Sequence, residues 1–188
     1  MGAVIGGRRV ALRPLREKDL DKLREWDEDE EIYRFSGKKF TGRGVAEWLA
    51  TYDGRKARAL GIADESGRLI GDLELENINW RRREAELRIC LGEKVLWNRG
   101  YGTEAIGALL EHVFGVEGFA QIYLRVYSSN RRAIRCYEKC GFIPEGRLRL
   151  GGRTDGAEDI LLMSITRGRF ARHRARGERA GRQASGRA

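Results

Sequence analysis

Residues 96–105, LWNRGYGTEA, join an alternating apolar run to a run with helical spacing. Closely spaced glycines at such a junction leave main-chain N–H groups of the first helical turn exposed, and the helix dipole adds partial positive charge there. Gly100 and Gly102 let a ligand approach the main chain, while Arg99 supplies a fixed cation. The stretch therefore predicts either a phosphate-binding helix start or a tight, ligand-free turn from strand to helix.

Two common phosphate motifs do not fit this stretch. No Gly-Lys-Ser/Thr follows the glycines, which excludes a Walker loop. Ile106 stands where a dinucleotide-binding turn needs its last small residue. If the junction binds phosphate, it does so as a different kind of site.

A second block, SSNRRAIRCYEKCGFIPEG, follows ICLGEKVLWNRGYGTEA along the chain. The two blocks, in this order, strongly resemble the GCN5-related N-acetyltransferase (GNAT) family. In that family a [Q/R]-x-x-G-x-[G/A] motif holds the pyrophosphate of acetyl-coenzyme A (acetyl-CoA). The resemblance implies that the cosubstrate is bound by Trp97, Asn98, Arg99, Gly100, Tyr101, Gly102 and Thr103.

One residue departs from the family motif. Trp97 stands in place of the usual Gln or Arg. This departure resembles the branch of ribosomal-protein N-terminal acetyltransferases and polyamine or antibiotic acetyltransferases, whose loops often read WGKGYGTEA. Cosubstrate binding is still expected.

The resemblance covers roughly residues 8–166 and implies an α/β (α+β) fold with one GNAT-like domain. We expect a mixed central sheet of about seven strands, mostly antiparallel and splayed at the cofactor site, with about four helices. The pantetheine arm of acetyl-CoA is expected to insert between the parted strands. The resemblance implies main-chain contacts from Cys90, Leu91 and Gly92, whose N–H groups could also stabilise an oxyanion.

Direct transfer to an amine requires two proton-transfer roles, because an amine with a pKa of about 10 is almost wholly protonated at neutral pH. Tyr137 matches the family tyrosine that donates a proton to the coenzyme sulfur; its alternative role is core packing. Asn130 matches a residue that contacts coenzyme A, and it can also cap the helix that follows it.

Glu86 resembles the family glutamate that accepts the proton of the amine. Glu74 and Glu76 share a strand face and are rivals for this role. A solvated carboxylate, or a water relay without one dedicated base, remains open.

Apolar spacing along the chain predicts the same kind of fold. Strands are expected at residues 8–15, 57–63, 69–78, 85–91, 121–128, 142–150 and 158–165. Helices are expected at residues 16–31, in the segment before residue 51, at 101–115 and at 131–140.

Composition and length indicate one folded domain. The 188 residues are 41% hydrophobic and 35% charged, with a formal net charge of +9. We expect an N-terminal extension at residues 1–7, the N-acetyltransferase domain at 8–167 and a basic tail at 168–188. The tail holds most of the positive charge and few apolar residues, which predicts disorder; it is either a solubilising appendage or an RNA-binding element.

The sequence gives less support for metal binding, disulfide bonds or a catalytic histidine. Cys90, Cys136 and Cys140 form no metal-ligand pattern and cannot all pair, so we expect neither a metal site nor a disulfide framework. His112 and His173 are expected at the surface. With no apparent leader or membrane-spanning segment, a cytoplasmic location is the default expectation.

Two functions follow. The first is an N-acetyltransferase that uses acetyl-CoA and an amine acceptor: a peptide or protein N-terminus, a polyamine or an aminoglycoside. The second is an inactive CoA-binding module that associates with RNA through the basic tail. A homodimer is compatible with either function, and the loops at residues 77–83 and 151–156 are expected to select the acceptor.

Overall fold

A single sheet runs through the protein, in a computed structural model that describes residues 4–36, 45–149 and 158–185. The described strands lie in the order β1-β2-β3-β4-β5-β6-β8-β7. They are β1 (Ile5–Gly6), β2 (Val10–Pro14), β3 (Arg58–Asp64), β4 (Leu69–Asn79), β5 (Glu84–Leu91), β6 (Gln121–Tyr127), β7 (Ile143–Leu148) and β8 (Ile160–Thr166). All neighbouring strands pair antiparallel except β5 and β6, which are parallel.

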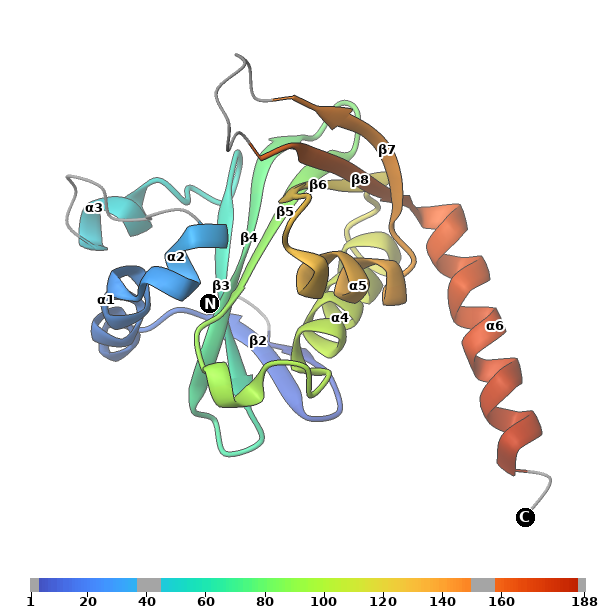
Figure 1. Ribbon diagram of the computed structural model, residues 1–188, viewed down its shortest axis with the longest axis horizontal. Helices are drawn as coiled ribbons and strands as arrows, with labels where there is room; N and C mark the ends of the chain where they lie inside the picture. Colours follow the sequence, from blue (N-terminus) through green and yellow to red (C-terminus); the bar gives the residue numbers. More distant parts are fainter. Residues whose placement is uncertain (1–3, 37–44, 150–157, 186–188) are drawn as a thin grey trace.

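Helices cover the two sides of the sheet (Figure 1). One side carries α1 (Leu20–Glu28), α2 (Glu30–Ser36) and α3 (Val45–Ala50). The other carries α4 (Tyr101–Gly115), α5 (Arg131–Lys139) and α6 (Arg167–Ser185). This mixed fold confirms the expected class. The eighth strand is the two-residue β1, which lies in the segment expected to be an N-terminal extension.

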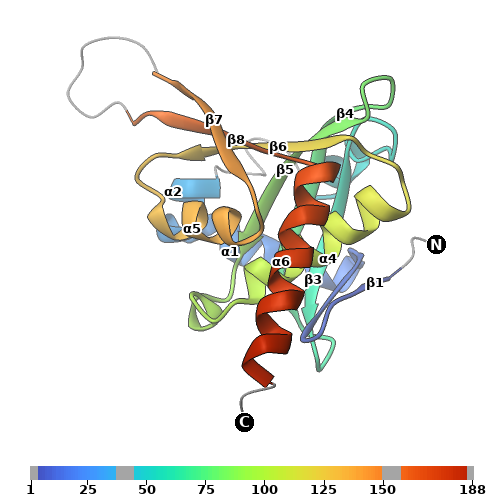
Figure 2. The same cartoon turned by 90° about the vertical axis from the view of Figure 1, so that its right-hand side faces the viewer.

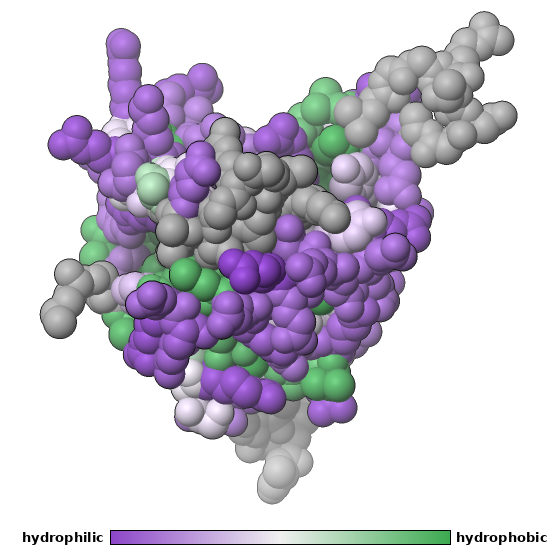
Figure 3. All heavy atoms as spheres, turned by 90° about the vertical axis from the view of Figure 1, so that its left-hand side faces the viewer, coloured by the Kyte–Doolittle hydropathy of each residue, from purple (hydrophilic) through white to green (hydrophobic). Residues whose placement is uncertain are grey.

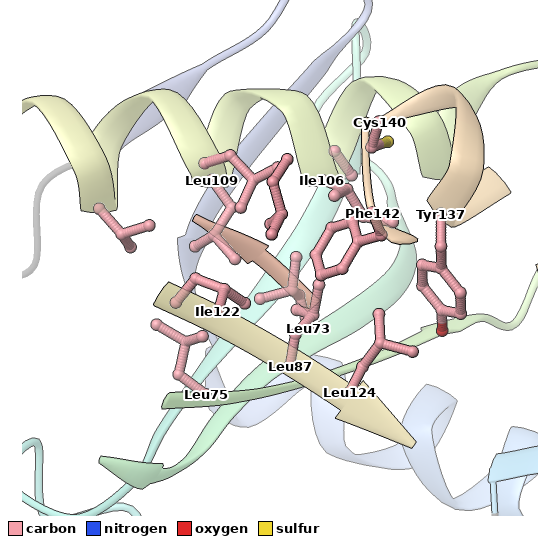
Figure 4. Packing of buried hydrophobic residues seen from close by; sticks show 14 of the residues in the cluster. Leu73, Leu75, Leu87, Ile106, Leu109, Ile122, Leu124, Tyr137, Cys140 and Phe142 are labelled. Carbon is pink, nitrogen blue, oxygen red and sulfur yellow. The ribbon is translucent and has the colours of Figure 1, made fainter. Parts of the chain in front are cut away.

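The main apolar core lies between the sheet and α4 (Figure 4). Alternation along β5 directs Ala85 and Leu87 into this core, while helical spacing brings Ile106 and Leu109 of α4 onto them. Ile122 of β6 is also fully buried there. The core therefore holds α4 in place against β5 and β6.

A second apolar cluster lies under α1–α3. Its buried members are Leu23, Trp26, Ile32, Trp48, Leu69 and Cys90. The outer face of this side is mostly hydrophilic, with scattered hydrophobic patches (Figure 3). Packing under these helices is therefore separate from the core beneath α4.

The helix expected at residues 16–31 is divided at Asp29. That residue has an extended backbone (φ −79°, ψ 116°), which ends α1. Its carboxylate oxygen Oδ1 accepts hydrogen bonds from the N–H groups of Glu31 and Ile32, at 3.0 and 3.2 Å. Asp29 therefore caps the start of α2, a local bond that competes with helix continuation.

The C-terminal segment differs from its expected disorder, because residues 167–185 form the helix α6. Phe170 is buried, with its ring centroid 5.6 Å from that of Phe114 on α4. Arg174 forms an ion pair of 2.8 Å with Glu111, also on α4. One aromatic anchor and a few polar contacts thus hold a segment whose composition favours disorder.

No helix within the described ranges combines the length and apolar character needed to cross a bilayer.

Gly92 shows how tightly the β5 end is packed. Its N–H donates to the carbonyl oxygen of Ile70 at 3.1 Å, and a Cβ at this position would overlap the indole of Trp26. A Cβ added to Gly107, within α4, would meet no atom within 4 Å outside its own helix. A methyl group would therefore fit at Gly107 but would clash at Gly92.

We expect Gly92→Ala to lower the free energy of unfolding by about 1–3 kcal/mol, because overpacking forces Trp26 to move. Gly107→Ala is the matched control and should be neutral or stabilising by up to about 1 kcal/mol, because alanine favours helix. Denaturant unfolding of both variants measures the difference. Equal stability of the two variants would contradict the close packing at Gly92.

Candidate functional site

The site begins where β5 and β6 part. The two strands pair only at three positions, ending with Glu86 opposite Tyr123. Beyond that point β6 remains paired with β8 along its whole length, whereas β5 continues beside β4. A cleft of about 270 Å³ opens in this part of the fold, bounded by residues of β5, β6, α2, α4 and α5. The expected splay of the sheet is confirmed.

Most residues predicted to contact the cosubstrate line this cleft. They are Cys90, Leu91, Trp97, Asn98, Gly100, Tyr101, Gly102, Thr103 and Asn130. Two predicted residues are not among the lining residues. Gly92 packs against Trp26, and the carbonyl oxygen of Arg99 accepts a 3.2 Å hydrogen bond from Arg9.

The start of α4 faces the cleft through its first three residues. Gly100, the N-cap, has a left-handed backbone with φ 89°, and its residue type provides no capping side chain. The N–H groups of the first turn therefore remain available for an anion, and the helix dipole adds positive potential. This geometry suits the phosphate-binding alternative, which stays a prediction from the sequence.

The absence of a side chain at Gly102 leaves space for a ligand beside the start of α4. A Cβ on Gly102 would lie 3.4 Å from both the Sγ of Cys136 and the Cδ1 of Leu91. Alanine would just fit, whereas a branched side chain would enter the cleft or displace its walls.

A basic wall faces the start of α4, and the sequence analysis missed it. Arg132, Arg135 and Lys139 of α5 all line the cleft. They recur at spacings of three and four residues, which places them on neighbouring positions of the helix surface. That spacing was readable in the sequence once α5 was known to border the cleft.

Trp97 links this wall to β5. Its indole Nε1 donates a 2.7 Å hydrogen bond to the carbonyl oxygen of Leu91. The guanidinium carbon of Arg132 lies 3.4 Å from the centroid of a Trp97 ring, a cation–π arrangement. Burial lowers the pKa of Arg132 from its usual value. Trp97 therefore holds the guanidinium of Arg132 near the position at which the family motif has Gln or Arg.

Asn130 caps α5, as predicted, with its Oδ1 accepting a 3.1 Å hydrogen bond from the N–H of Ala133. It also lines the cleft, so capping and ligand contact are compatible.

Cys136 and Cys140 lie one helical turn apart beside Thr103. The Sγ of Cys136 lies 3.3 Å from the Thr103 Oγ1. A hydrogen bond from the Cys140 thiol, assisted by Thr103, lowers the pKa of Cys136 to about 7, and the same interaction raises that of Cys140. None of the three cysteines forms a disulfide. No group of three or more metal-ligating side chains occurs among the described residues.

Tyr137 projects from α5 with its hydroxyl at the end away from the helix (Figure 4). Burial raises the pKa of this hydroxyl above its usual value, with nearby cysteines adding to the shift. The hydroxyl is therefore protonated and neutral at physiological pH. Its ring also packs on Phe142, with centroids 5.9 Å apart, so the packing role is present beside any catalytic one.

A smaller cavity, of about 50 Å³, adjoins the cleft. Six residues line both spaces: Phe35, Ser36, Ile89, Cys90, Arg125 and Tyr137. The smaller cavity also contacts Asp72, Glu74 and Arg88. Tyr137 therefore stands in a wall between a basic cleft and a small cavity lined by charges of both signs, with Arg125 opposing the carboxylates as Arg88 does.

The acidic side chains come from neighbouring strands. Glu74 is opposite Arg88, and Glu76 is opposite Glu86, across the β4–β5 pair. The Oε2 of Glu74 accepts a 2.7 Å hydrogen bond from the hydroxyl of Tyr52. Arg88 lies 3.8 Å from Glu74 and 3.4 Å from Glu76. The charges are thus only partly compensated.

Glu86, the predicted base, is buried and bound on both oxygens. Arg125 donates to Oε1 at 2.6 Å and to Oε2 at 3.0 Å, and Asn77 donates to Oε2 at 2.9 Å. Neither Glu86 nor its rival Glu76 lines the cleft or the smaller cavity. The sequence could not reveal this pairing, because it depends on the register of β5 with β6.

Glu76 is more accessible, with 26% of its side chain exposed compared with 2% for Glu74. Burial raises the pKa of Glu76, and the charges of Glu74 and Glu86 add to the shift, against the opposing effect of Arg88. Glu76 and Asn77 border an open depression of about 690 Å³ that also includes Tyr52 and Trp80. Part of the loop expected at residues 77–83 lies here, whereas residues 151–156 lie outside the described residues.

Comparison with known proteins identifies the family. The profile of the acetyltransferase (GNAT) domain matches residues 9–143, which is more than half of the chain. The chain belongs to the GNAT acetyltransferase family. It is an acyltransferase with acetyl-CoA as its cosubstrate.

Several relatives act on amines. Spermidine N(1)-acetyltransferase of Escherichia coli (strain K12) is 28% identical over 142 residues, covering 74% of this chain and 75% of that enzyme. Aminoglycoside N(6')-acetyltransferase type 1 of Klebsiella pneumoniae is 28% identical over 180 residues, covering 88% and 87%. The spermidine N(1)-acetyltransferase of Vibrio cholerae is 34% identical over 87 residues, and this match spans 50% of that enzyme.

A solved structure confirms the fold. The Vibrio cholerae spermidine N-acetyltransferase in complex with CoA and spermine superposes with a TM-score of 0.75 and 25% identity. The match covers 87% of this chain and 98% of that one.

We expect Gly102→Val to weaken coenzyme A binding at least tenfold, because its methyl groups would occupy the cleft beside the helix start. Isothermal titration of the folded variant with coenzyme A measures the loss. Gly107→Val is the control for valine in the same helix, and it should bind normally. Normal affinity of Gly102→Val would count against an anion site at this helix start.

Proposed function

We propose that this protein acetylates a primary amine of a small polycation, a polyamine or an aminoglycoside, by direct attack on bound acetyl-CoA. The observation that carries the proposal is the position of Tyr137 in the wall between the basic cleft and the smaller cavity, which contains buried carboxylates. A negatively charged cosubstrate suits the cleft, and the carboxylates of Asp72 and Glu74 would attract the amino group of an acceptor towards Tyr137. The spermidine and aminoglycoside acetyltransferases among the relatives support the same acceptor class.

The cosubstrate side of the mechanism rests on two groups of donors. N–H groups at the start of α4 would bind the pyrophosphate, and Arg132, Arg135 and Lys139 would neutralise its charge. The part of β5 beyond its pairing with β6, near Cys90 and Leu91, would bind the pantetheine arm as a further strand would. An N–H group on this edge could stabilise the oxyanion that forms during attack.

The chemical step needs a neutral amine and a protonated leaving group. The amine nitrogen forms a bond with the thioester carbonyl carbon, and the carbon–sulfur bond then breaks. Tyr137, whose hydroxyl is protonated at neutral pH, donates its proton to the departing thiolate. The proton lost by the amine passes to a carboxylate, directly or through water.

For this proton acceptor we favour Glu76. The role of Glu86 as the base stays a prediction from the sequence. A base must have a free oxygen, and both oxygens of Glu86 accept hydrogen bonds from Arg125 or Asn77. Glu76 has only a long contact with Arg88, a partly exposed side chain and a raised pKa. Its carboxylate is therefore better suited than that of Glu86 to accept a proton.

An acceptor screen tests the proposal. Spermidine, spermine, kanamycin and a peptide with a free N-terminus are offered with acetyl-CoA, while thiol release and product mass are followed. Turnover with the polyamines or kanamycin, and little with the peptide, is expected. Preferred acetylation of the peptide would overturn the acceptor class.

We expect Tyr137→Phe to lower kcat about 10–100-fold and to leave coenzyme A affinity within about twofold, because only the proton donor is lost. Tyr127→Phe, which removes a hydroxyl outside both cavities, should keep normal turnover. Steady-state kinetics and coenzyme A titration separate the two effects. An unchanged kcat for Tyr137→Phe would dismiss the hydroxyl as the donor.

We expect kcat/KM to rise with pH through the pKa of Glu76, because the base acts only when deprotonated. The shift is upward, so this acid limb should lie above the ordinary glutamate value of 4.5. Glu76→Gln should remove the limb and lower kcat/KM at neutral pH at least tenfold, whereas Glu86→Gln should retain it. Loss of the limb in Glu86→Gln alone would assign the base to Glu86, and its persistence in both variants would favour a water relay.

A further inference from the structure

The helix α6 is held to the domain along one side. Phe170 packs on Phe114, and the Nε2 of His173 lies 2.9 Å from the carbonyl oxygen of Lys139. Arg174 pairs with Glu111 at 2.8 Å. Figure 2 shows the helix running along the domain beside α4, with its C-terminal end extending past it. The side that faces the domain is therefore already defined.

Four arginines occupy the opposite side of α6. Arg169, Arg172, Arg176 and Arg179 are separated by three, four and three residues, which aligns them on one helix face. At a rise of about 1.5 Å per residue, this arginine stripe is about 15 Å long. Arg172, Arg176 and Arg179 are exposed to solvent.

The arginine stripe lacks compensating charge. None of its four members forms an ion pair with the described residues. Elsewhere many arginines are paired, such as Arg9 with Glu104 and Arg58 with Glu117. A row of unpaired guanidinium groups on a helix held in place by the domain presents donors suited to a series of phosphates.

The surroundings of the arginine stripe discriminate between polyanions. Helices that bind membranes bury large apolar side chains in the lipid, but Phe170 is the one large apolar residue in the described part of α6, and it faces Phe114. A duplex groove accepts a helix with free flanks, whereas contacts with α4 and α5 cover one flank of α6. A flexible strand can follow the exposed face without these obstacles.

We propose that the arginine stripe of α6 binds single-stranded nucleic acid through its phosphates. Because the stripe has no aromatic side chain for base stacking, binding should be independent of sequence. The helix that carries this surface lies on the opposite side of the molecule from α1–α3 (Figure 1), and none of the four arginines lines the cleft or the smaller cavity.

The test uses the full chain and a fluorescent oligouridine of about 20 nucleotides. Anisotropy is measured from about 50 to 200 mM salt. The triple variant Arg172→Gln/Arg176→Gln/Arg179→Gln should bind at least tenfold more weakly. Its salt slope should fall by about 2, because each phosphate contact on a single strand contributes about 0.7.

A charge-matched control separates this surface from net charge. Arg24→Gln/Arg34→Gln/Arg55→Gln removes three exposed arginines located on or near α1–α3, and it should retain wild-type binding. Acetyl-transfer rates and thermal unfolding midpoints should be similar in both triple variants. A failure of acetyl transfer in all proteins would leave the binding result intact.

Three results would overturn the proposal. They are equal losses in the two triple variants, tighter binding of a duplex DNA of the same length, and preferred binding to vesicles of phosphatidylcholine and phosphatidylserine. An oligothymidine should bind as well as the oligouridine, because the phosphates are shared.

Discussion

The separation of β5 from β6 is the constraint on which the rest of the site depends. A sheet normally satisfies its main-chain N–H and C=O groups through neighbouring strands, and an interior edge leaves them without such partners. Here pairing stops after Glu86 and Tyr123. The ion pair between Glu86 and Arg125 connects the strands just where they part. A buried carboxylate at this point requires such a partner, so the fork and its bridge are stabilised together.

The sheet separates two electrostatic environments. Towards α4 and α5, the cleft combines a helix start with three basic side chains. Towards α1–α3, the strands present carboxylates with Arg88 among them. Among the described residues, the cleft is lined by basic side chains without carboxylates, whereas the smaller cavity contains carboxylates, and this difference would favour different ligand groups in each. A residue that acts on both ligands must lie in the wall between the two cavities, and Tyr137 lies there.

Local patterns were sufficient to predict most of the fold. Alternation in β4 and β5, and the helical spacing of Ile106 and Leu109 in α4, identified elements that the main core requires. Side-chain pairings between distant strands were not predictable in the same way. Glu86 meets Arg125 only after β5 and β6 have aligned in parallel, and no spacing along the chain encodes that contact.

Two departures have different physical origins. Asp29 is compatible with a helix interior by charge pattern, but its carboxylate accepts hydrogen bonds from the N–H groups of Glu31 and Ile32 and begins a new helix. The α6 segment has a composition typical of disorder, yet tertiary contacts around Phe170 orient its first turns. In both cases a small number of specific contacts outweighs the average tendency of the surrounding residues. Among the cleft residues, the basic wall of α5 was overlooked because its charges resemble an ordinary solvated face.

The intrinsic fluorescence of Trp97 reports on the cleft. Its indole is fixed by the carbonyl of Leu91 and covered by the guanidinium of Arg132 within the cleft. Trp26 and Trp48 are buried in the separate cluster under α1–α3, and Trp80 stacks near Phe119. A ligand that draws the guanidinium away from the indole face would change the emission of one tryptophan out of four. Arrival of the anionic partner could thus be followed in real time without attaching a dye.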